Sequence, residues 1–185
     1  MSREVRLSLG SEETALLDWL ARRLLDLVDA PAPADDPLAD WEAERSATPL
    51  DRDNPVLERL FPPAYDDLAL EAEYRRLSEA GLRRGKADDA RLMLADLTSV
   101  DGQVVIAEDR LEAWLRTVNA LRLALAARLG LNTARQVEAV ERLPRSDPRH
   151  DPVLVFHWLG QLLETLVVAS WGNGDEARPT SAEGR

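Results

Sequence analysis

The segment 153–171 constrains the fold of this chain more than any other, because its residues are apolar on nearly every side of a helix. Asp151-Pro152, directly before it, is a typical helix start, with an N-cap residue followed by proline in the first turn. Such a helix needs neighbours on all sides, so we expect it to form the buried centre of the domain. We do not expect it to span a membrane, because His157, Gln161 and Glu164 lie inside it.

The remaining helices follow from apolar residues that recur at helical spacing. Such segments cover residues 12–29, 68–97, 111–129 and 133–142, and residues 56–61 are expected to dock as one helical turn. Gly130 occupies the C-terminal capping position of the third segment, and Asn132 is expected to cap the fourth. A break or kink is expected near Ser78–Gly81.

Two short segments alternate apolar and polar residues, as strands do. They are Val5–Leu9 and Gln103–Ile106, and because each is too short to be stable alone, we expect them to pair. The chain is therefore predicted to be mostly α, a single-domain helical bundle of five or six helices with a small two-stranded β-ribbon.

A stretch rich in proline and acidic residues follows the first helix. Residues 30–60 hold five of the eleven prolines and eight acidic residues against three arginines. This composition is typical of a surface segment with little regular structure. We expect one domain over residues 1–171, with a flexible acidic insertion at about 30–54, and a disordered tail over residues 172–185.

The charge and the cysteine count exclude several classes of function. The chain has 34 acidic and 23 basic residues, a formal net charge of −11, which argues against broad, non-specific binding to DNA or membranes. It has no cysteine, so disulfides, thiol switches, cysteine nucleophiles and zinc–thiolate sites are excluded. The first residues lack the apolar core of a signal peptide, and we expect a cytoplasmic protein.

A candidate polar cluster joins two of the predicted helices. Arg122 lies in the middle of the apolar stripe of 111–129, where a partly buried guanidinium needs a partner. His157, Gln161 and Glu164 form one polar line along the last helix. Glu164 is the expected partner of Arg122, with Asn119 within reach. The cluster either fixes the register of the two helices or forms a ligand pocket or a notch for a partner.

Catalysis and metal binding are not expected at this cluster. No Ser, Cys or Gly-rich phosphate loop accompanies His157 and Glu164. Two histidines without cysteine make a poor set of transition-metal ligands. We therefore predict no enzyme activity, no metal and no cofactor.

A local excess of basic residues contrasts with the acidic chain. Residues 75–91 hold six basic side chains against three acidic ones, and the candidate partner surface consists of Arg75, Arg76, Arg83, Arg84 and Lys86. This surface is a solvated helix face, holds the acidic insertion, or contacts nucleic acid. Residues 127–136 mimic the turn of a helix-turn-helix, but the helix that follows carries too few basic residues for reading a DNA sequence.

Three stretches of the sequence, in this order and spacing, resemble one known family. They are Leu60-Phe61-Pro62 followed by Tyr74-Arg75-Arg76-Leu77, then residues 114–130, then residues 157–164. The chain is similar to the actinobacterial family catalogued as domain of unknown function 2017, also called the actinomycete oxidative-stress regulator family. The resemblance implies an all-helical regulatory protein that controls transcription in the oxidative-stress response through an alternative sigma factor. Redox sensing in that family is attributed to a cysteine pair, which this chain lacks, so a thiol switch is not carried over.

We accordingly expect a non-enzymatic regulatory or adaptor protein that acts through contacts with another protein. The first alternative is a transcription factor that binds DNA directly. The second is a small-ligand binder or an enzyme that uses Arg122, His157 and Glu164. An exposed apolar patch would favour the adaptor, a contiguous basic face would favour DNA binding, and a deep polar pocket would favour the ligand binder.

Overall fold

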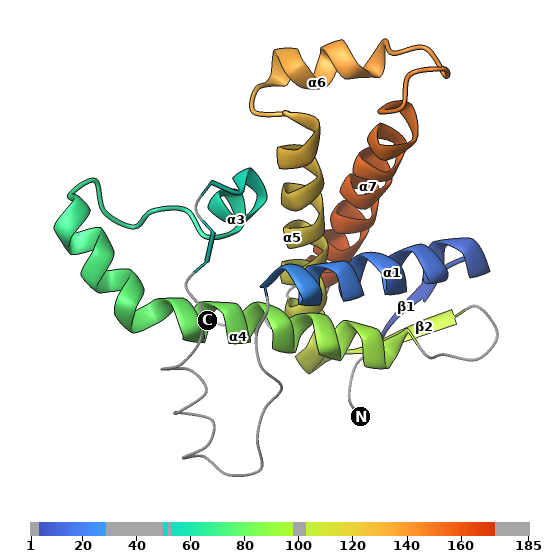
Figure 1. The fold of residues 1–185 in the computed structure, drawn as a ribbon. Helices are drawn as coiled ribbons and strands as arrows, with labels where there is room; N and C mark the ends of the chain where they lie inside the picture. The colour runs from blue at the N-terminus through green and yellow to red at the C-terminus, as the bar shows by residue number, and fades with distance from the viewer. Residues whose placement is uncertain (1–3, 29–49, 52, 98–102, 173–185) are drawn as a thin grey trace, which may run out of the picture.

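A computed structural model of the chain describes residues 4–28, 50–51, 53–97 and 103–172. These residues form six α-helices, one short 3-10 helix and one two-stranded antiparallel sheet (Figure 1). In chain order the elements are β1 (Glu4–Ser8), α1 (Ser11–Val28), α3 (Pro55–Leu60), α4 (Leu68–Asp96), β2 (Gln103–Ala107), η1 (Glu108–Arg110), α5 (Leu111–Leu129), α6 (Ala134–Glu141) and α7 (His150–Gly172). The predicted fold, a mostly helical bundle with a small ribbon, is confirmed.

The ribbon contributes one apolar face to the core. Strand β1 pairs antiparallel with β2, so that Val5 lies opposite Ile106 and Leu7 lies opposite Val104. Leu7, Val104 and Ile106 are buried, whereas their neighbours along each strand are more exposed. This alternation is the period-two pattern that predicted both strands.

Helix α5 is the centre of the bundle, and the prediction that residues 153–171 form that centre is wrong. Helix α5 packs against α3, α4 and α7, and its Trp114 and Val118 are fully buried. Helix α7 packs mainly on α5 and lies at the edge of the bundle (Figure 1). One side of α7 is buried, but Leu154, Val168 and Trp171 on its other side are 56%, 64% and 72% exposed. Apolar residues on every side of a helix therefore did not ensure that every side is covered.

Helix α7 also has the length and composition of a membrane span. Residues 150–171 make it the one helix in the described ranges that meets this criterion, and 28% of its most apolar window is buried. The core helix of a soluble protein meets the same criterion, so length and hydropathy do not by themselves assign a membrane.

Helix α4 runs without interruption through the site of the predicted break. The ribbon of α4 changes direction along its first half in Figure 1. The Ser78 hydroxyl donates a hydrogen bond of 2.8 Å to the carbonyl of Tyr74, one turn earlier, a contact that often bends helices. The predicted irregularity is thus a bend rather than a break.

Of three predicted helix ends, one is observed as predicted and two differ in detail. Gly130 caps α5 with φ of 69°, in the left-handed region that favours glycine, as predicted. Thr133, not Asn132, caps α6, because its hydroxyl oxygen accepts from the amide of Gln136. Helix α7 begins at His150, so Asp151 lies in its first turn rather than at its N-cap.

Two long-range contacts fix α5 and α7 in the bundle. Asp96, at the end of α4, accepts a hydrogen bond of 3.0 Å from the indole Nε1 of Trp114 and forms an ion pair with Arg110. Trp158 of α7 donates a hydrogen bond of 3.0 Å from Nε1 to Glu13 of α1. Both bonds give a large aromatic side chain a partner for its one polar atom.

Most of the predicted acidic insertion lies outside the described residues, as does the tail after Gly172. The last residues of the insertion contact the domain. The amide of Leu50 donates a hydrogen bond of 2.9 Å to Glu79 of α4, and Asn54 caps α3 by accepting from the amide of Val56. The chain from Leu50 onward is therefore attached to the bundle.

Candidate functional site

The predicted polar cluster is not assembled. The guanidinium of Arg122 lies 4.7 Å from the centre of the Phe156 ring, and its buried Nε has no hydrogen-bond partner. A Cβ placed on Gly160 would lie 3.4 Å from that Nε, so the absence of a side chain at Gly160 makes room for Arg122. Gln161 and Glu164 are exposed, and in the described part of the chain no hydrogen bond or ion pair joins Arg122 to Glu164. The side of α7 that meets α5 carries Phe156 and Gly160, not the polar line.

The other predicted members of the cluster lie at separate places. His157 approaches α6, with its Nε2 3.7 Å from Glu141, and Asn119 lines a pocket between α4 and α5. No group of three His, Asp or Glu side chains in the described residues could hold a metal ion. The geometry therefore brings no pair of predicted site residues together for acid–base chemistry.

The five residues of the candidate partner surface do not form a basic face. Only Arg76 among them is exposed, and it pairs with Glu73 one turn away. Arg83 is buried and donates a hydrogen bond of 2.6 Å from Nε to the carbonyl of Val28, at the end of α1. Arg84 and Lys86 are half-buried. The feature that would favour direct DNA binding, a contiguous basic surface, is thus not formed by these residues.

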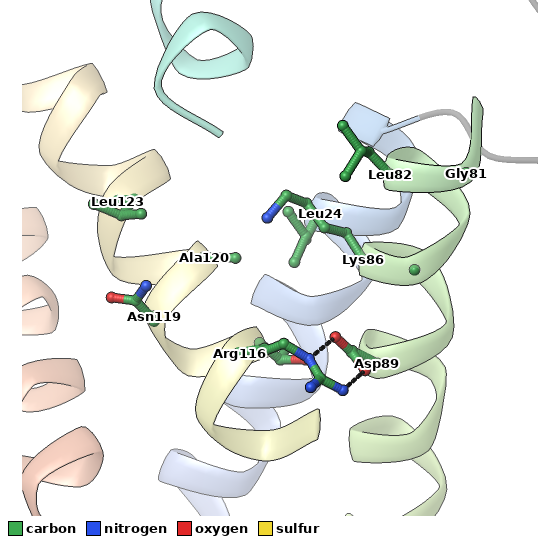
Figure 2. A pocket seen from close by; sticks show the side chains of 11 residues that line it. Leu24, Gly81, Leu82, Lys86, Asp89, Arg116, Asn119, Ala120 and Leu123 are labelled. Carbon is green, nitrogen blue, oxygen red and sulfur yellow. Dashed lines mark hydrogen bonds and ion pairs between the residues drawn. The ribbon is translucent and has the colours of Figure 1, made fainter. Parts of the chain in front are cut away.

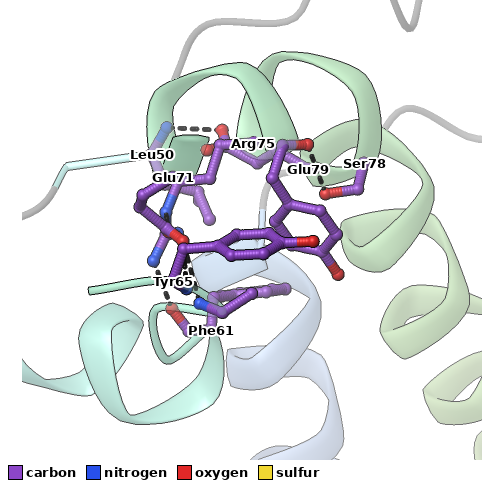
Figure 3. A network of polar contacts seen from close by, with 9 residues as sticks. Leu50, Phe61, Tyr65, Glu71, Arg75, Ser78 and Glu79 are labelled. Atoms are coloured by element: carbon purple, nitrogen blue, oxygen red, sulfur yellow. Dashed lines mark hydrogen bonds and ion pairs between the residues drawn. The ribbon is translucent and has the colours of Figure 1, made fainter. Parts of the chain in front are cut away.

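Arg75 instead belongs to a structural network that connects α4 to the segment after α3 (Figure 3). It forms an ion pair with Glu71 and donates a hydrogen bond of 2.9 Å to the carbonyl of Phe61. The buried Glu71 carboxylate also accepts from the amides of Ala64 and Tyr65, at 2.8 and 3.1 Å. Burial acts to raise the pKa of Glu71, but these amides and the Arg75 guanidinium outweigh it and hold the pKa below its usual value. These charges fix a loop rather than recruit a partner.

A pocket of about 350 Å³ opens between α1, α4 and α5 (Figure 2). Lys86 reaches from α4 toward α5, and Arg116 binds Asp89 with two hydrogen bonds of 2.7 and 2.8 Å at one end of the pocket. Thr117 and Asn119 of α5 complete the polar part of the lining. This pocket was not predicted from the sequence. The one signal that could have indicated it is Lys86, the one lysine of the chain.

The outer face of α7 is exposed, although the sequence predicts a helix that is buried on all sides. We use this name for the exposed residues Leu154, Gln161, Glu164, Val168 and Trp171. Their spacing of three, four and seven residues places them on one side of the helix. Large apolar side chains lie at both ends of this face, with polar side chains between them.

A family model and several named proteins are similar to this chain over most of its length. The family model described as "Domain of unknown function (DUF2017)" matches residues 1–170. The "Oxidative stress regulator AosR" of Mycobacterium tuberculosis (strain ATCC 25618 / H37Rv) is 30% identical over 185 residues, which cover 91% of this chain and 83% of that protein. The "Putative oxidative stress regulator AosR" of Mycobacterium leprae (strain TN) is 32% identical over 176 residues, 85% of this chain and 78% of that protein. No solved structure matches the chain. These relatives are named as regulators and not as enzymes.

Proposed function

Since the chain belongs to the DUF2017 family, we propose that it is a non-enzymatic regulatory protein that binds another protein through the outer face of α7. Its relatives named oxidative stress regulators support the regulatory role. The site of contact is argued from this chain alone.

The exposure of large apolar side chains on α7 carries the proposal. Leu154, Val168 and Trp171 are all more than half exposed on one helix face. Burying such surface contributes about 25 cal/mol per Å², and large exposed apolar side chains beside polar ones commonly mark sites of protein contact. A tryptophan at the end of the patch is the residue type most enriched among energetic hot spots of interfaces.

The charge of the chain indicates what kind of partner fits. The net charge is −11, and Glu164 lies between the apolar ends of the outer face. A partner with apolar anchors flanking an arginine or lysine would complement this surface in shape and in charge. The alternative sigma factor implied by the family resemblance is the first partner to test.

This contact is expected to be independent of thiol chemistry. The chain has no cysteine, so no disulfide can form or open within it. The affinity for the partner should therefore be equal in buffers that contain mild peroxide or a reductant. A large peroxide-dependent change would contradict a constitutive contact.

Substitution by charge on the outer face tests the proposal. Leu154→Arg should leave the circular dichroism spectrum unchanged and weaken binding to a purified partner by at least about tenfold, because the arginine would be buried in an apolar contact. Leu77→Arg is the matched control, because Leu77 is an exposed leucine on α4, 69% accessible against 56% for Leu154. Equal affinities for Leu154→Arg and the wild type would place the contact elsewhere.

A further inference from the structure

We propose that the pocket between α1, α4 and α5 binds a small organic anion, a carboxylate or phosphate ester with an apolar group, and that Lys86 is its cationic contact. This site is separate from the outer face of α7 and does not depend on the function proposed for that face. A bound metabolite of this class would make the protein responsive to a small molecule.

Two exposed glycines on α4 line the pocket and leave its α4 side open. Gly81 and Gly85 are one turn apart and line the pocket, and a Cβ placed on either would meet no atom within 4 Å. Gly160 differs, because a Cβ there would lie 3.4 Å from Nε of Arg122. Glycine destabilises a helix interior relative to alanine, and packing does not require it at positions 81 and 85. The pocket volume of about 350 Å³ lies in the range of ligand pockets.

Lys86 is the cation in the pocket for which the described residues provide no ion pair, whereas Arg116 is paired with both Asp89 and Glu112. Asp89 is bound by Arg116 through both carboxylate oxygens. Lys86 is half-buried, and among the described residues its ammonium has a contact to the ring of Phe61 at 5.5 Å but no carboxylate partner. Burial lowers the pKa of Lys86, with Asp89 opposing and Arg116 adding to this effect. An anion in the pocket would offset the cost of holding this charge partly out of water.

A second polar group in the lining lacks a partner. Thr117 is 1% exposed, and within the described ranges its hydroxyl oxygen has no hydrogen-bond partner. A threonine inside a helix often bonds a carbonyl one turn earlier, which Thr117 does not do. A buried hydroxyl without a protein partner is the kind of group that a ligand atom or an ordered water satisfies.

The remaining lining indicates what accompanies the anionic group. Leu24, Leu82 and Leu123 form apolar walls, and exposed Asn119 lies at the rim of the pocket on α5 (Figure 2). Ammonium, hydroxyl and amide groups can all donate to an oxyanion. The leucines would contact an apolar group of modest size, such as a single ring.

The test uses four probes on the full chain: benzoate, phenyl phosphate, neutral benzyl alcohol and inorganic phosphate. Reductive methylation with ¹³C-formaldehyde retains the positive charge and gives a single lysine signal in the NMR spectrum, because Lys86 is the one lysine. Benzoate or phenyl phosphate should shift this signal saturably below about 10 mM and raise the pKa of Lys86. The comparison between the two shows which anion is preferred.

Calorimetry on unmodified protein compares anion binding by the wild type with binding by two matched variants. Lys86→Met should weaken binding of the preferred anion by at least about tenfold, whereas Arg76→Met, which removes an exposed charge from the same helix, should leave it unchanged. Equal binding by Lys86→Met and wild type, equal binding of benzyl alcohol and benzoate, or no saturation with either organic anion would overturn the proposal. Inorganic phosphate binding as tightly as phenyl phosphate would overturn the assignment of an apolar group. The NMR titration of Lys86 in the otherwise wild-type protein tests the proposal even if a variant fails to fold.

Discussion

Replacement of Asp96 by alanine should be among the most damaging single changes in this protein. The Asp96 side chain is 8% exposed, and it accepts the indole hydrogen of fully buried Trp114 while pairing with Arg110. A hydrogen bond to a charged acceptor contributes about 1.5–3 kcal/mol, and the loss leaves the Trp114 donor buried without a partner. The Arg110 side chain is 39% exposed, so its ion pair adds only up to about 1 kcal/mol. We therefore expect Asp96→Ala to lower the free energy of unfolding by about 3 kcal/mol.

Two further variants separate the hydrogen bond from the charge. Asp96→Asn keeps an oxygen for the indole hydrogen and loses the charge, so it should cost only about 1 kcal/mol. In a Trp114→Phe background the donor is gone, and Asp96→Ala should then also cost about 1 kcal/mol. The double-mutant cycle thus predicts a coupling of about 2 kcal/mol between Asp96 and Trp114.

Urea denaturation followed by circular dichroism measures the free energies of unfolding of the wild type, the two single variants of the cycle and the double variant. This measurement does not depend on the fluorescence of the tryptophan that is replaced. Additive effects of Asp96→Ala and Trp114→Phe would refute the reasoning, because they would show that the indole hydrogen does not rely on Asp96. A loss below about 1 kcal/mol for Asp96→Ala alone would have the same meaning.

Two other predictions concern single side chains. Arg122→Ala should lower the free energy of unfolding by about 2 kcal/mol, because it removes the contact with Phe156 and the packing of the methylene groups. Arg122→Met should lower it by less than about 1 kcal/mol, because the described residues offer Arg122 no ion pair that could be broken. Identical urea midpoints for the two variants would contradict this. The Arg149 side chain and amide lower the pKa of Asp147 from its ordinary value near 3.8 to about 2, so this carboxylate stabilises the fold above about pH 4 and loses that contribution as the pH falls toward 2. The difference in melting temperature between wild type and Asp147→Asn should therefore shrink between pH 4 and 2, and a constant difference over that range would show that the pairing does not contribute to stability.

Local signals in the sequence were sufficient for the helices and strands. Gly130 ends α5 because glycine adopts a positive φ without strain, and this preference is a property of the residue alone. The alternation in Val104-Val105-Ile106 predicted a strand for a similar reason, since successive side chains of a strand point to opposite faces. The cap of α6 moved by one residue because the neighbouring side chains Asn132 and Thr133 are both able to occupy it, and α7 begins at His150, ahead of the cap predicted at Asp151.

The candidate site depended on information that is not local. Periodicity shows that His157, Gln161 and Glu164 share one side of α7, but not which side meets α5. A helix that is apolar all round has no single face that determines its orientation. In the structure Phe156 and Gly160 face Arg122, and Gln161 and Glu164 are exposed. The resemblance to a family survived this error because it rests on the order of residues and not on their arrangement in space.

The sequence by itself determined the helical class, the two short strands, the absence of thiol chemistry and the family, since each depends on residue identity or on patterns within a few positions. Only the tertiary structure decided that Arg75 and Arg83 bind backbone carbonyls, that α7 leaves large apolar side chains exposed, and that Lys86 lines a pocket with Gly81 and Gly85. An arginine in a sequence has the same charge whether it ends in water or against the carbonyl of Val28, 55 residues away. Its role is fixed by which distant groups the folded chain brings to it, because the free energy of a charge depends on its surroundings.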